Sequence, residues 1–173
     1  FFCVDSIDEE TWSNEGGNPR ERIELHERWY HYIVDEFVLR VQEISTFDNG
    51  GKSYDKMMTC GCSMGAFHAL NTMLRRPDVF DKVLAMSGIY HASFFFHEYQ
   101  DELTYQNSPS DYLANLKEDH PYMELYRQSE VILCCGQGAW EQECENSLHH
   151  MEQIYADKQI DVWIDFWGYD VSH

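Results

Sequence analysis

A pentapeptide at residues 61–65, Gly-Cys-Ser-Met-Gly, constrains the fold of this chain more than any other feature. It fits the pattern Gly-x-Ser-x-Gly, in which a serine lies on a strained turn with its hydroxyl exposed. That turn needs a strand before it and a helix after it, and residues 56–61 and 65–76 have the matching apolar patterns. We expect Gly61 and Gly65 both to be required, because a side chain at either would collide with the neighbouring strand or helix. The alternative interpretation is a tight turn with a buried serine.

Short apolar runs alternate with helical patterns along the chain. The runs predict five strands, at residues 1–5, 56–61, 82–87, 131–136 and 160–166. The helices are expected at residues 20–44, 65–76 and 141–157. The first helix follows Asn18-Pro19, a pair that is typical of a helix start. The alternation predicts a single α/β domain over residues 1–173, with a mostly parallel sheet and helices on both faces.

One segment, residues 88–126, breaks this alternation and is rich in tyrosine and phenylalanine. It leaves the carboxyl end of the strand 82–87, which is where open α/β sheets place their ligands. We therefore expect an insert or lid near the site, or the wall of an apolar substrate pocket. The alternative is a loop whose aromatic rings pack on the core. Trp12, Tyr90 and His91 are the candidate substrate contacts.

A catalytic serine needs a histidine as base and a carboxylate that orients the histidine. These two residue types are therefore expected at strand ends that follow Ser63, with the acid before the histidine. Glu141 is the first carboxylate after the strand 131–136, and Glu143 is the second candidate. His173 is the only histidine in the loop after the last strand. The order predicts a triad of Ser63, His173 and Glu141, although a lone His or Glu in a loop is more often merely solvated.

The charge and the cysteine content exclude several function classes. The formal net charge of −19 argues against nucleic acid, whose phosphates need lysine and arginine, and disfavours anionic membrane surfaces. No apolar run approaches the roughly 20 residues of a membrane span. No Cys-x-x-Cys pair occurs, so we expect no metal site but buried free thiols in a reducing, cytoplasmic compartment. The six cysteines are Cys3, Cys60, Cys62, Cys134, Cys135 and Cys144.

Six stretches of the chain together carry a resemblance: residues 61–66, 76–80, 87–88, 107–109, 136–141 and 167–173. In these stretches the chain resembles the esterase D-like esterases of the α/β-hydrolase superfamily, which include S-formylglutathione hydrolases, feruloyl esterases and mycolyltransferases. The resemblance covers nearly all of the chain and implies the α/β-hydrolase fold. It also implies that N-terminal strands and a last helix are missing here, so we expect the sequence to be a piece of a longer protein.

The resemblance implies a serine esterase that cleaves a carboxylic ester or thioester through a Ser-His-Glu triad and an acyl-enzyme. It implies no metal and no organic cofactor, and it assigns the backbone N–H of Met64 to the oxyanion hole. Two alternatives stay open: an acyltransferase that uses the same triad, and a non-catalytic scaffold that binds a ligand or a partner. The expected partner is a small-molecule ester. The oligomeric state is open, with a homo-oligomer as one alternative.

Overall fold

The computed structural model describes all 173 residues, and the chain falls into two compact units. The first unit comprises Phe1–Asp55 and Ala92–Tyr105, and the second comprises Lys56–His91 and Gln106–His173. The aromatic segment 88–126 is therefore divided between the two units. Its assignment as an insert or lid stays a prediction, as does the single domain.

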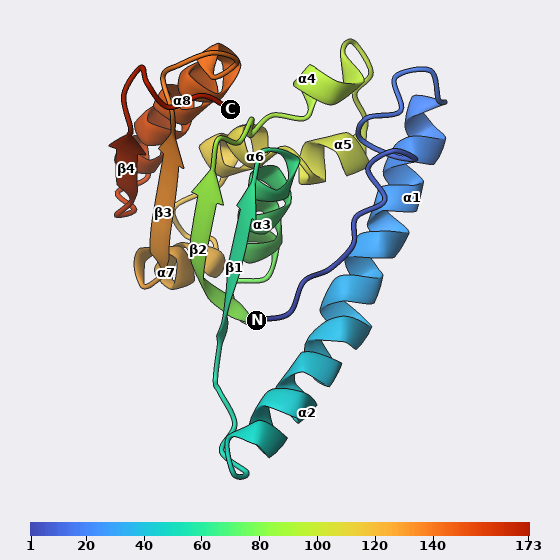
Figure 1. Cartoon of the computed structure of the whole chain (residues 1–173), viewed down its shortest axis with the longest axis vertical. Coiled ribbons are helices and arrows are strands. Elements are labelled where there is room, and N and C mark those ends of the chain that lie inside the picture. The colour runs from blue at the N-terminus through green and yellow to red at the C-terminus, as the bar shows by residue number, and fades with distance from the viewer. The chain divides into compact units, whose positions relative to one another are not determined.

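The second unit is built on a four-stranded parallel sheet (Figure 1). The strands lie in the order β1-β2-β3-β4, and each pairs in parallel with the next one along the chain. Their bounds are β1 Met57–Cys62, β2 Phe80–Met86, β3 Glu130–Cys135 and β4 Trp163–Phe166. The predicted α/β class and four of the five predicted strands are confirmed. Because the strands run the same way, their carboxyl ends meet at one edge of the sheet.

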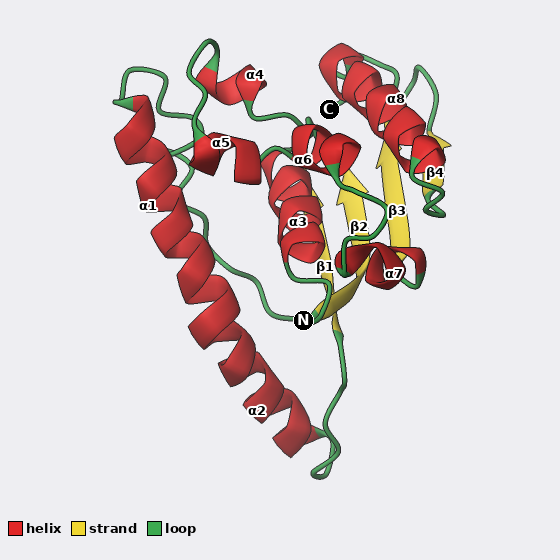
Figure 2. Cartoon of the chain, turned by 180° about the vertical axis from the view of Figure 1, so that it is seen from behind, coloured by secondary structure: helices red, strands yellow, loops and turns green.

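Four helices of this unit lie on the same side of the sheet, as Figures 1 and 2 both show. They are α3 Met64–Arg75, α6 Pro109–Asn115, α7 Tyr122–Arg127 and α8 Gln142–Asp157. The prediction of helices on both faces is therefore wrong for this unit. The reason is the strand order: every connection moves one strand over in the same direction. Such parallel crossovers are almost always right-handed, so each one returns over the same face.

No helix of the second unit covers the other face of the sheet, and this explains why two cysteines of β1 are exposed. Thr59 faces the helices, since its Oγ1 donates a hydrogen bond to Ala69 O of α3 at 2.9 Å. Side chains alternate along a strand, so Cys60 and Cys62 point to the opposite face, and both are exposed. The expectation of buried thiols is wrong for these two and for Cys3. The other three cysteines are buried, and all six are free.

Residues 1–5 do not form the predicted strand. They have no regular secondary structure, and Phe1, Phe2 and Val4 are exposed. An apolar run becomes a strand only where a neighbouring strand pairs with its N–H and C=O groups. The first unit, to which these residues belong, contains no strand. Apolar content alone therefore predicted a strand that has no partner.

The first unit is dominated by a continuous helical stretch that is longer than the predicted helix 20–44. It comprises α1 Pro19–His31, the π-helix η1 Tyr32–Phe37 and α2 Val38–Asp48. Two short helices follow later in the chain, α4 Ser93–Phe96 and α5 Glu102–Gln106. No helix of either unit has the length and apolarity that crossing a membrane requires.

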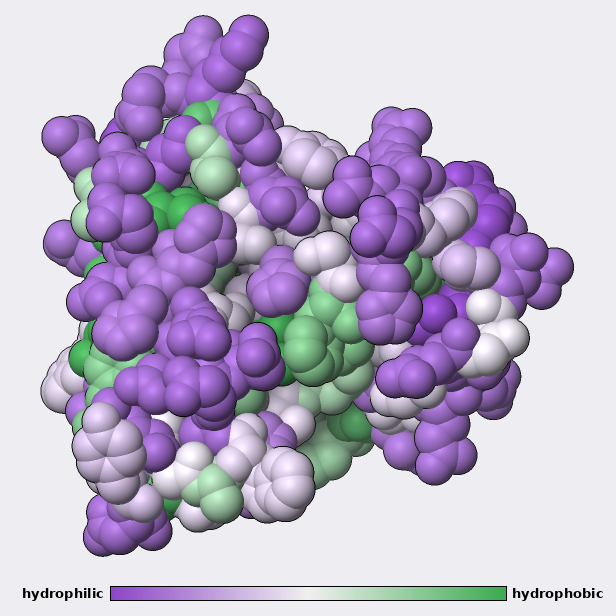
Figure 3. Space-filling view, turned by 90° about the horizontal axis from the view of Figure 1, so that it is seen from above, coloured by the Kyte–Doolittle hydropathy of each residue, from purple (hydrophilic) through white to green (hydrophobic).

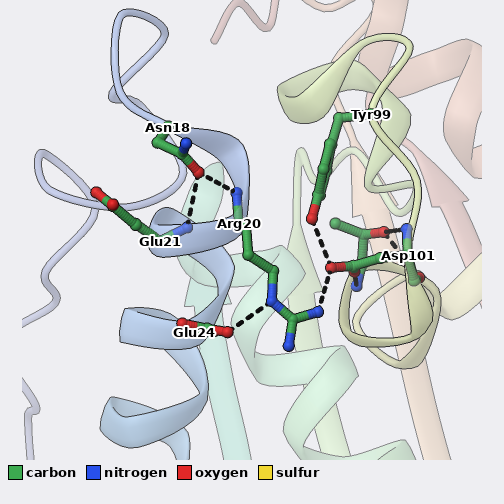
Figure 4. A network of polar contacts seen from close by, with 7 residues as sticks. Asn18, Arg20, Glu21, Glu24, Tyr99 and Asp101 are labelled. Carbon is green, nitrogen blue, oxygen red and sulfur yellow. Dashed lines mark hydrogen bonds and ion pairs between the residues drawn. The ribbon is translucent and has the colours of Figure 1, made fainter.

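The start of α1 is fixed by a polar network (Figure 4). The Asn18 side-chain oxygen accepts hydrogen bonds from the backbone N–H groups of Arg20 and Glu21, as the Asn-Pro pair predicted. The Arg20 guanidinium then donates to Glu24 at 2.6 Å and to Asp101 at 2.7 Å. These contacts connect the first turn of α1 to the segment that carries α5.

Arg22 of α1 holds the core of the first unit together. Its buried guanidinium donates to three backbone carbonyls, those of Thr11 at 2.6 Å, Trp12 at 2.8 Å and Phe95 at 3.1 Å. It also lies over the ring of Phe96, 4.5 Å from the ring centroid. Burial lowers the pKa of Arg22, and the negative charge of Glu15 offsets only part of this effect. Three segments of the chain therefore depend on one side chain.

Replacing Arg22 by Met should destabilise the protein, because it removes the buried hydrogen bonds that the guanidinium donates to three carbonyl groups. We expect a loss of about 1–3 kcal/mol in the free energy of unfolding, measured by urea denaturation followed by circular dichroism. The matched control is Arg40→Met, since Arg40 pairs with Glu43 at the surface, where such a contact contributes little. Equal unfolding midpoints for the two variants would contradict this assignment.

Candidate active site

Ser63 lies on a strained turn between β1 and α3, as the pentapeptide predicted. Its backbone angles are φ 55° and ψ −123°, a conformation that residues other than glycine rarely adopt. Its N–H donates to Met86 O of β2 at 2.9 Å, which fixes the turn to the neighbouring strand. Strain of this kind persists only where the surrounding structure enforces it, and it is frequent at functional sites.

The two glycines of the pentapeptide have different roles. A Cβ on Gly61 would lie 2.1 Å from Gly65 O and 2.3 Å from its carbonyl carbon, which no side-chain movement can relieve. A Cβ on Gly65 would meet no atom within 4 Å. The expected collision is therefore confirmed for Gly61 and wrong for Gly65. Close approach of the helix start to the strand explains the first glycine, and nothing in the structure explains the second.

The structure brings together the three residues of the predicted triad. His173 Nε2 lies 2.7 Å from Ser63 Oγ, which is hydrogen-bonding distance. The other ring nitrogen, Nδ1, lies 3.7 Å from Glu141 Oε1, longer than a hydrogen bond. The Glu141 side chain is 1% exposed and that of His173 is 32% exposed. Glu143, the alternative acid, is exposed in the first turn of α8.

Ser87 holds the Glu141 carboxylate in place. It is the first residue after β2, and its Oγ donates a hydrogen bond to Glu141 Oε1 at 2.7 Å. Its own backbone is in the left-handed region, with φ 54°, and its N–H donates to Cys134 O at 2.7 Å. Ser87 therefore contacts the acid from the end of a fourth strand, β2. The carboxylate's other oxygen, Oε2, is buried and has no hydrogen-bond partner.

Cys144 completes the surroundings of the acid. It lies in the first turn of α8, and its Sγ donates to Ser87 O at 3.2 Å and lies 4.0 Å from His173 Nδ1. Burial, together with the negative charge of Glu141, raises the pKa of Cys144 to about 12. The thiol is therefore protonated at neutral pH and acts as a donor. Glu141, Cys144 and His173 each offer a metal-ligating atom, and these atoms lie within 4.8 Å of one another.

Backbone hydrogen bonds join the loop after β3 to the loop that carries His173. Gly138 N–H donates to Val171 O at 2.8 Å, and His173 N–H donates to Ala139 O at 3.1 Å. The two loops approach too closely for side chains at the glycines. A Cβ on Gly136 would lie 2.2 Å from Val171 O, and a Cβ on Gly138 would lie 2.6 Å from the same atom. The position of the histidine therefore depends on two glycines of the neighbouring loop.

Sequence reasoning missed Ser87 and these two glycines as contributors to the site. All three fall in stretches that carry the family resemblance, but no role followed from their residue types. A usable signal did exist for Ser87, because a hydroxyl residue directly after a strand lies at the ligand-binding edge of a parallel sheet. The pair Gly136 and Gly138 likewise indicated a close backbone approach. The approaching partner, Val171, could be identified only from the fold.

Of the three candidate substrate contacts, Trp12 belongs to the first unit, whereas Tyr90 and His91 belong to the second. Trp12 is 1% exposed and packs edge to face on His26, Phe95 and Phe96 in the first unit. Tyr90 is fully buried in the second unit, and burial raises its pKa well above the ordinary value. His91 is partly buried, and burial lowers its pKa. A role for these residues in substrate binding stays a prediction.

The asymmetry between the two elbow glycines can be tested directly. Gly61→Ala should fail to form the turn, because the added methyl group would overlap backbone atoms at the start of α3. Gly65→Ala should fold with unchanged or slightly higher stability, since alanine is the better helix former by about 1 kcal/mol. Thermal unfolding followed by circular dichroism measures both. A Gly61→Ala protein as stable as Gly65→Ala would show that the turn is not this tight.

Comparisons with known proteins bear on the family and the fold of this chain. The family described as "Putative esterase" matches residues 6–167. No curated protein matches the sequence. Among solved structures, a ferulic acid esterase is similar with 19% identity and a TM-score of 0.56, covering 81% of this chain and 53% of that one. An S-formylglutathione hydrolase from Agrobacterium tumefaciens has 14% identity and a TM-score of 0.55, covering 81% and 48%.

This chain thus spans about half the length of both enzymes, and at such identities the similarity shows the fold alone. That fold is the α/β-hydrolase fold, as the resemblance predicted. The family match is of a different kind, because it extends over nearly the whole sequence and includes the turn at Ser63 and the strand ends beside it. By this match, the chain belongs to the esterase family.

Proposed function

We propose that this protein is a serine hydrolase that cleaves a carboxylic ester or thioester through Ser63, His173 and Glu141. The observation that carries the proposal is the 2.7 Å contact between Ser63 Oγ and His173 Nε2, with the buried Glu141 carboxylate on the Nδ1 side of the ring. Family membership supports esterase activity independently of this contact. The assignment of the three roles rests on geometry and chain order.

In the proposed reaction, Ser63 Oγ attacks the ester carbonyl while His173 Nε2 takes its proton. The imidazolium that forms returns this proton to the leaving alcohol or thiol, and an acyl-enzyme remains on Ser63. Water, deprotonated by the same histidine, then releases the acid. The same geometry serves transfer to an alcohol acceptor, which replaces water in the second step.

Glu141 supports the charged histidine. A buried carboxylate next to Nδ1 favours the tautomer that leaves Nε2 unprotonated, and it stabilises the imidazolium that forms during attack. The 3.7 Å between Nδ1 and Oε1 must shorten for a direct hydrogen bond. Catalytic hydrogen bonds often tighten in this way when substrate binds. Ser87 Oγ keeps the carboxylate oriented meanwhile.

Negative charge that develops on the substrate oxygen would be stabilised at the start of α3. Met64 is the first residue of this helix, and the first N–H groups of a helix have no partner within it. They also lie at the positive end of the helix dipole. The N–H of Met64 therefore fits the role of an oxyanion donor beside Ser63.

Exposed aromatic side chains indicate the kind of substrate. Trp140 precedes Glu141 directly and is 87% exposed, and Tyr169 in the His173 loop is 79% exposed. Figure 3 views the chain from the side toward which the strands point, and there hydrophilic residues surround smaller apolar areas. We therefore infer a small-molecule ester with an apolar or aromatic part. Six free cysteines agree with the proposed cytoplasmic location.

Ser63→Ala should abolish ester hydrolysis and leave the fold unchanged. Loss of the nucleophile removes the covalent route, so we expect the turnover number to fall by about 10³-fold or more. The measurement is hydrolysis of a panel of nitrophenyl and thioesters. Ser172→Ala is the matched control, since this neighbouring hydroxyl donates no hydrogen bond to His173 and accepts from Ala139 N–H. A folded Ser63→Ala protein with most of its activity would end the proposal.

Glu141→Gln should slow hydrolysis by roughly 10²–10⁴-fold, because glutamine keeps the size of the side chain but removes the charge that stabilises imidazolium. Glu143→Gln is the control and should leave the rate nearly unchanged, since that side chain is exposed. Both rates are compared at saturating substrate on folded protein. The reverse pattern would assign the acid to Glu143.

A further inference from the structure

The neighbourhood of Glu141 contains a set of three metal-ligating side chains, of which the proposed ester hydrolysis uses Glu141 and His173 but not Cys144. Glu141 and Cys144 are three residues apart at the start of α8, so both side chains lie on one face of the helix. His173 Nδ1 lies 4.0 Å from Cys144 Sγ and 3.7 Å from Glu141 Oε1. Thiolate, imidazole and carboxylate are the three ligand types that zinc prefers in proteins.

We propose that Glu141, Cys144 and His173 Nδ1 bind one soft divalent cation, Zn²⁺ or its analogue Cd²⁺, and that this cation switches the triad off. The inhibitory half of the proposal rests on the proposed function, whereas the binding half does not. A three-ligand site of this kind leaves a coordination position for water.

The distances suit such a cation after a small contraction. Ligand atoms in a tetrahedral zinc site lie roughly 3.3–3.7 Å apart, given bond lengths of about 2.0–2.3 Å. Two of the three separations here are 3.7 Å and 4.0 Å, and none exceeds 4.8 Å. The hydrogen bond from His173 N–H to Ala139 O already joins the histidine to the loop that leads to Glu141.

A second observation points to a ligand at this place. Glu141 Oε2 is buried and has no hydrogen-bond partner, while Oε1 accepts from Ser87. A buried, unpaired carboxylate oxygen is costly, and a cation would satisfy it. The Glu141 side chain is 1% exposed and Cys144 is 3% exposed, so these two ligands are shielded from water. The partly exposed ring of His173 offers the route by which a cation enters.

Binding would stop catalysis through the tautomer of His173. The cation takes the lone pair of Nδ1, so the ring proton must reside on Nε2. The thiol proton of Cys144 is released to solvent as the metal–sulfur bond forms. An Nε2 that carries a proton donates to Ser63 Oγ and can no longer accept the proton of the attacking hydroxyl. No redox step is involved, and a chelator reverses the change.

The binding half is tested by titration with Cd²⁺, monitored by the ultraviolet cadmium–thiolate charge-transfer band. The titration uses a variant in which the exposed cysteines Cys3, Cys60 and Cys62 are serine, since they would bind soft metals adventitiously. We expect one equivalent of Cd²⁺ to bind. Cys144→Ala should weaken binding at least about tenfold, and Cys134→Ala, another buried cysteine, should not. Mg²⁺, which prefers oxygen ligands, should not compete.

An undiminished charge-transfer band in Cys144→Ala, with a native circular dichroism spectrum, would overturn the site. If that variant does not fold, Cys144→Ser decides in the same way, because it keeps the size of the side chain and removes the sulfur. The inhibitory half is tested by ester hydrolysis. Cd²⁺ should stop hydrolysis reversibly in the protein that keeps Cys144. In Cys144→Ser, the rate with Cd²⁺ should equal the rate of the same variant without metal. Stoichiometric binding without inhibition would overturn the switch. If no ester is hydrolysed at all, the proposed function fails, and the absorbance titration still decides the site.

Discussion

The parallel pairing of β1 to β4 is the constraint on which the candidate site depends. Parallel strands deliver all of their carboxyl ends to one edge, and here each strand end contributes one part of the site. Ser63 follows β1, Ser87 follows β2, Glu141 lies beyond β3 and His173 lies beyond β4. The residues are up to 110 positions apart in the chain, yet Ser63 and His173 are in hydrogen-bonding contact. An antiparallel arrangement would distribute the same loops over two opposite edges.

Strand pairing alone does not set the distances between the site residues, which depend also on close backbone contacts. Gly61 lets the start of α3 approach β1, so Ser63 is held in its strained conformation. Gly136 and Gly138 let the loop after β3 receive the carbonyl of Val171, which places the last residues of the loop that carries His173. Polar side chains of functional sites are often held by small residues of this kind, whose contribution is the absence of a side chain.

Much of this arrangement could be predicted from the sequence because it is encoded locally. The pentapeptide 61–65 with its flanks predicts a strand, a turn and a helix, and the chain order of acid and base then selects Glu141 and His173. The family resemblance led to the same residues, and the match over residues 6–167 shows the esterase family itself. Strand periodicity located four strands to within a few residues.

The predictions that failed concern features that depend on contacts between distant segments of the chain. Alternating strands and helices predict a parallel sheet but not the strand order, and the order decides which face the helices cover. The exposed Cys60 follows from that order. Residues 1–5 have the composition of a strand and no strand to pair with. Trp12 is an aromatic residue that could equally line a pocket or fill a core, and the structure places it in a core. The hydrogen bond from Ser87 to Glu141 joins two loops, and no local sequence pattern predicts that these loops lie together.

The central claim is that Ser63 is an activated nucleophile, and covalent labelling tests it most directly. A fluorophosphonate reacts with a serine whose hydroxyl is deprotonated by a neighbouring base, and mass spectrometry of the digested protein locates the adduct. We expect a single adduct on Ser63, and no labelling when His173 is replaced by Gln. An adduct on Ser87 or Ser172, or hydrolysis of esters by a protein that the reagent leaves unlabelled, would contradict it.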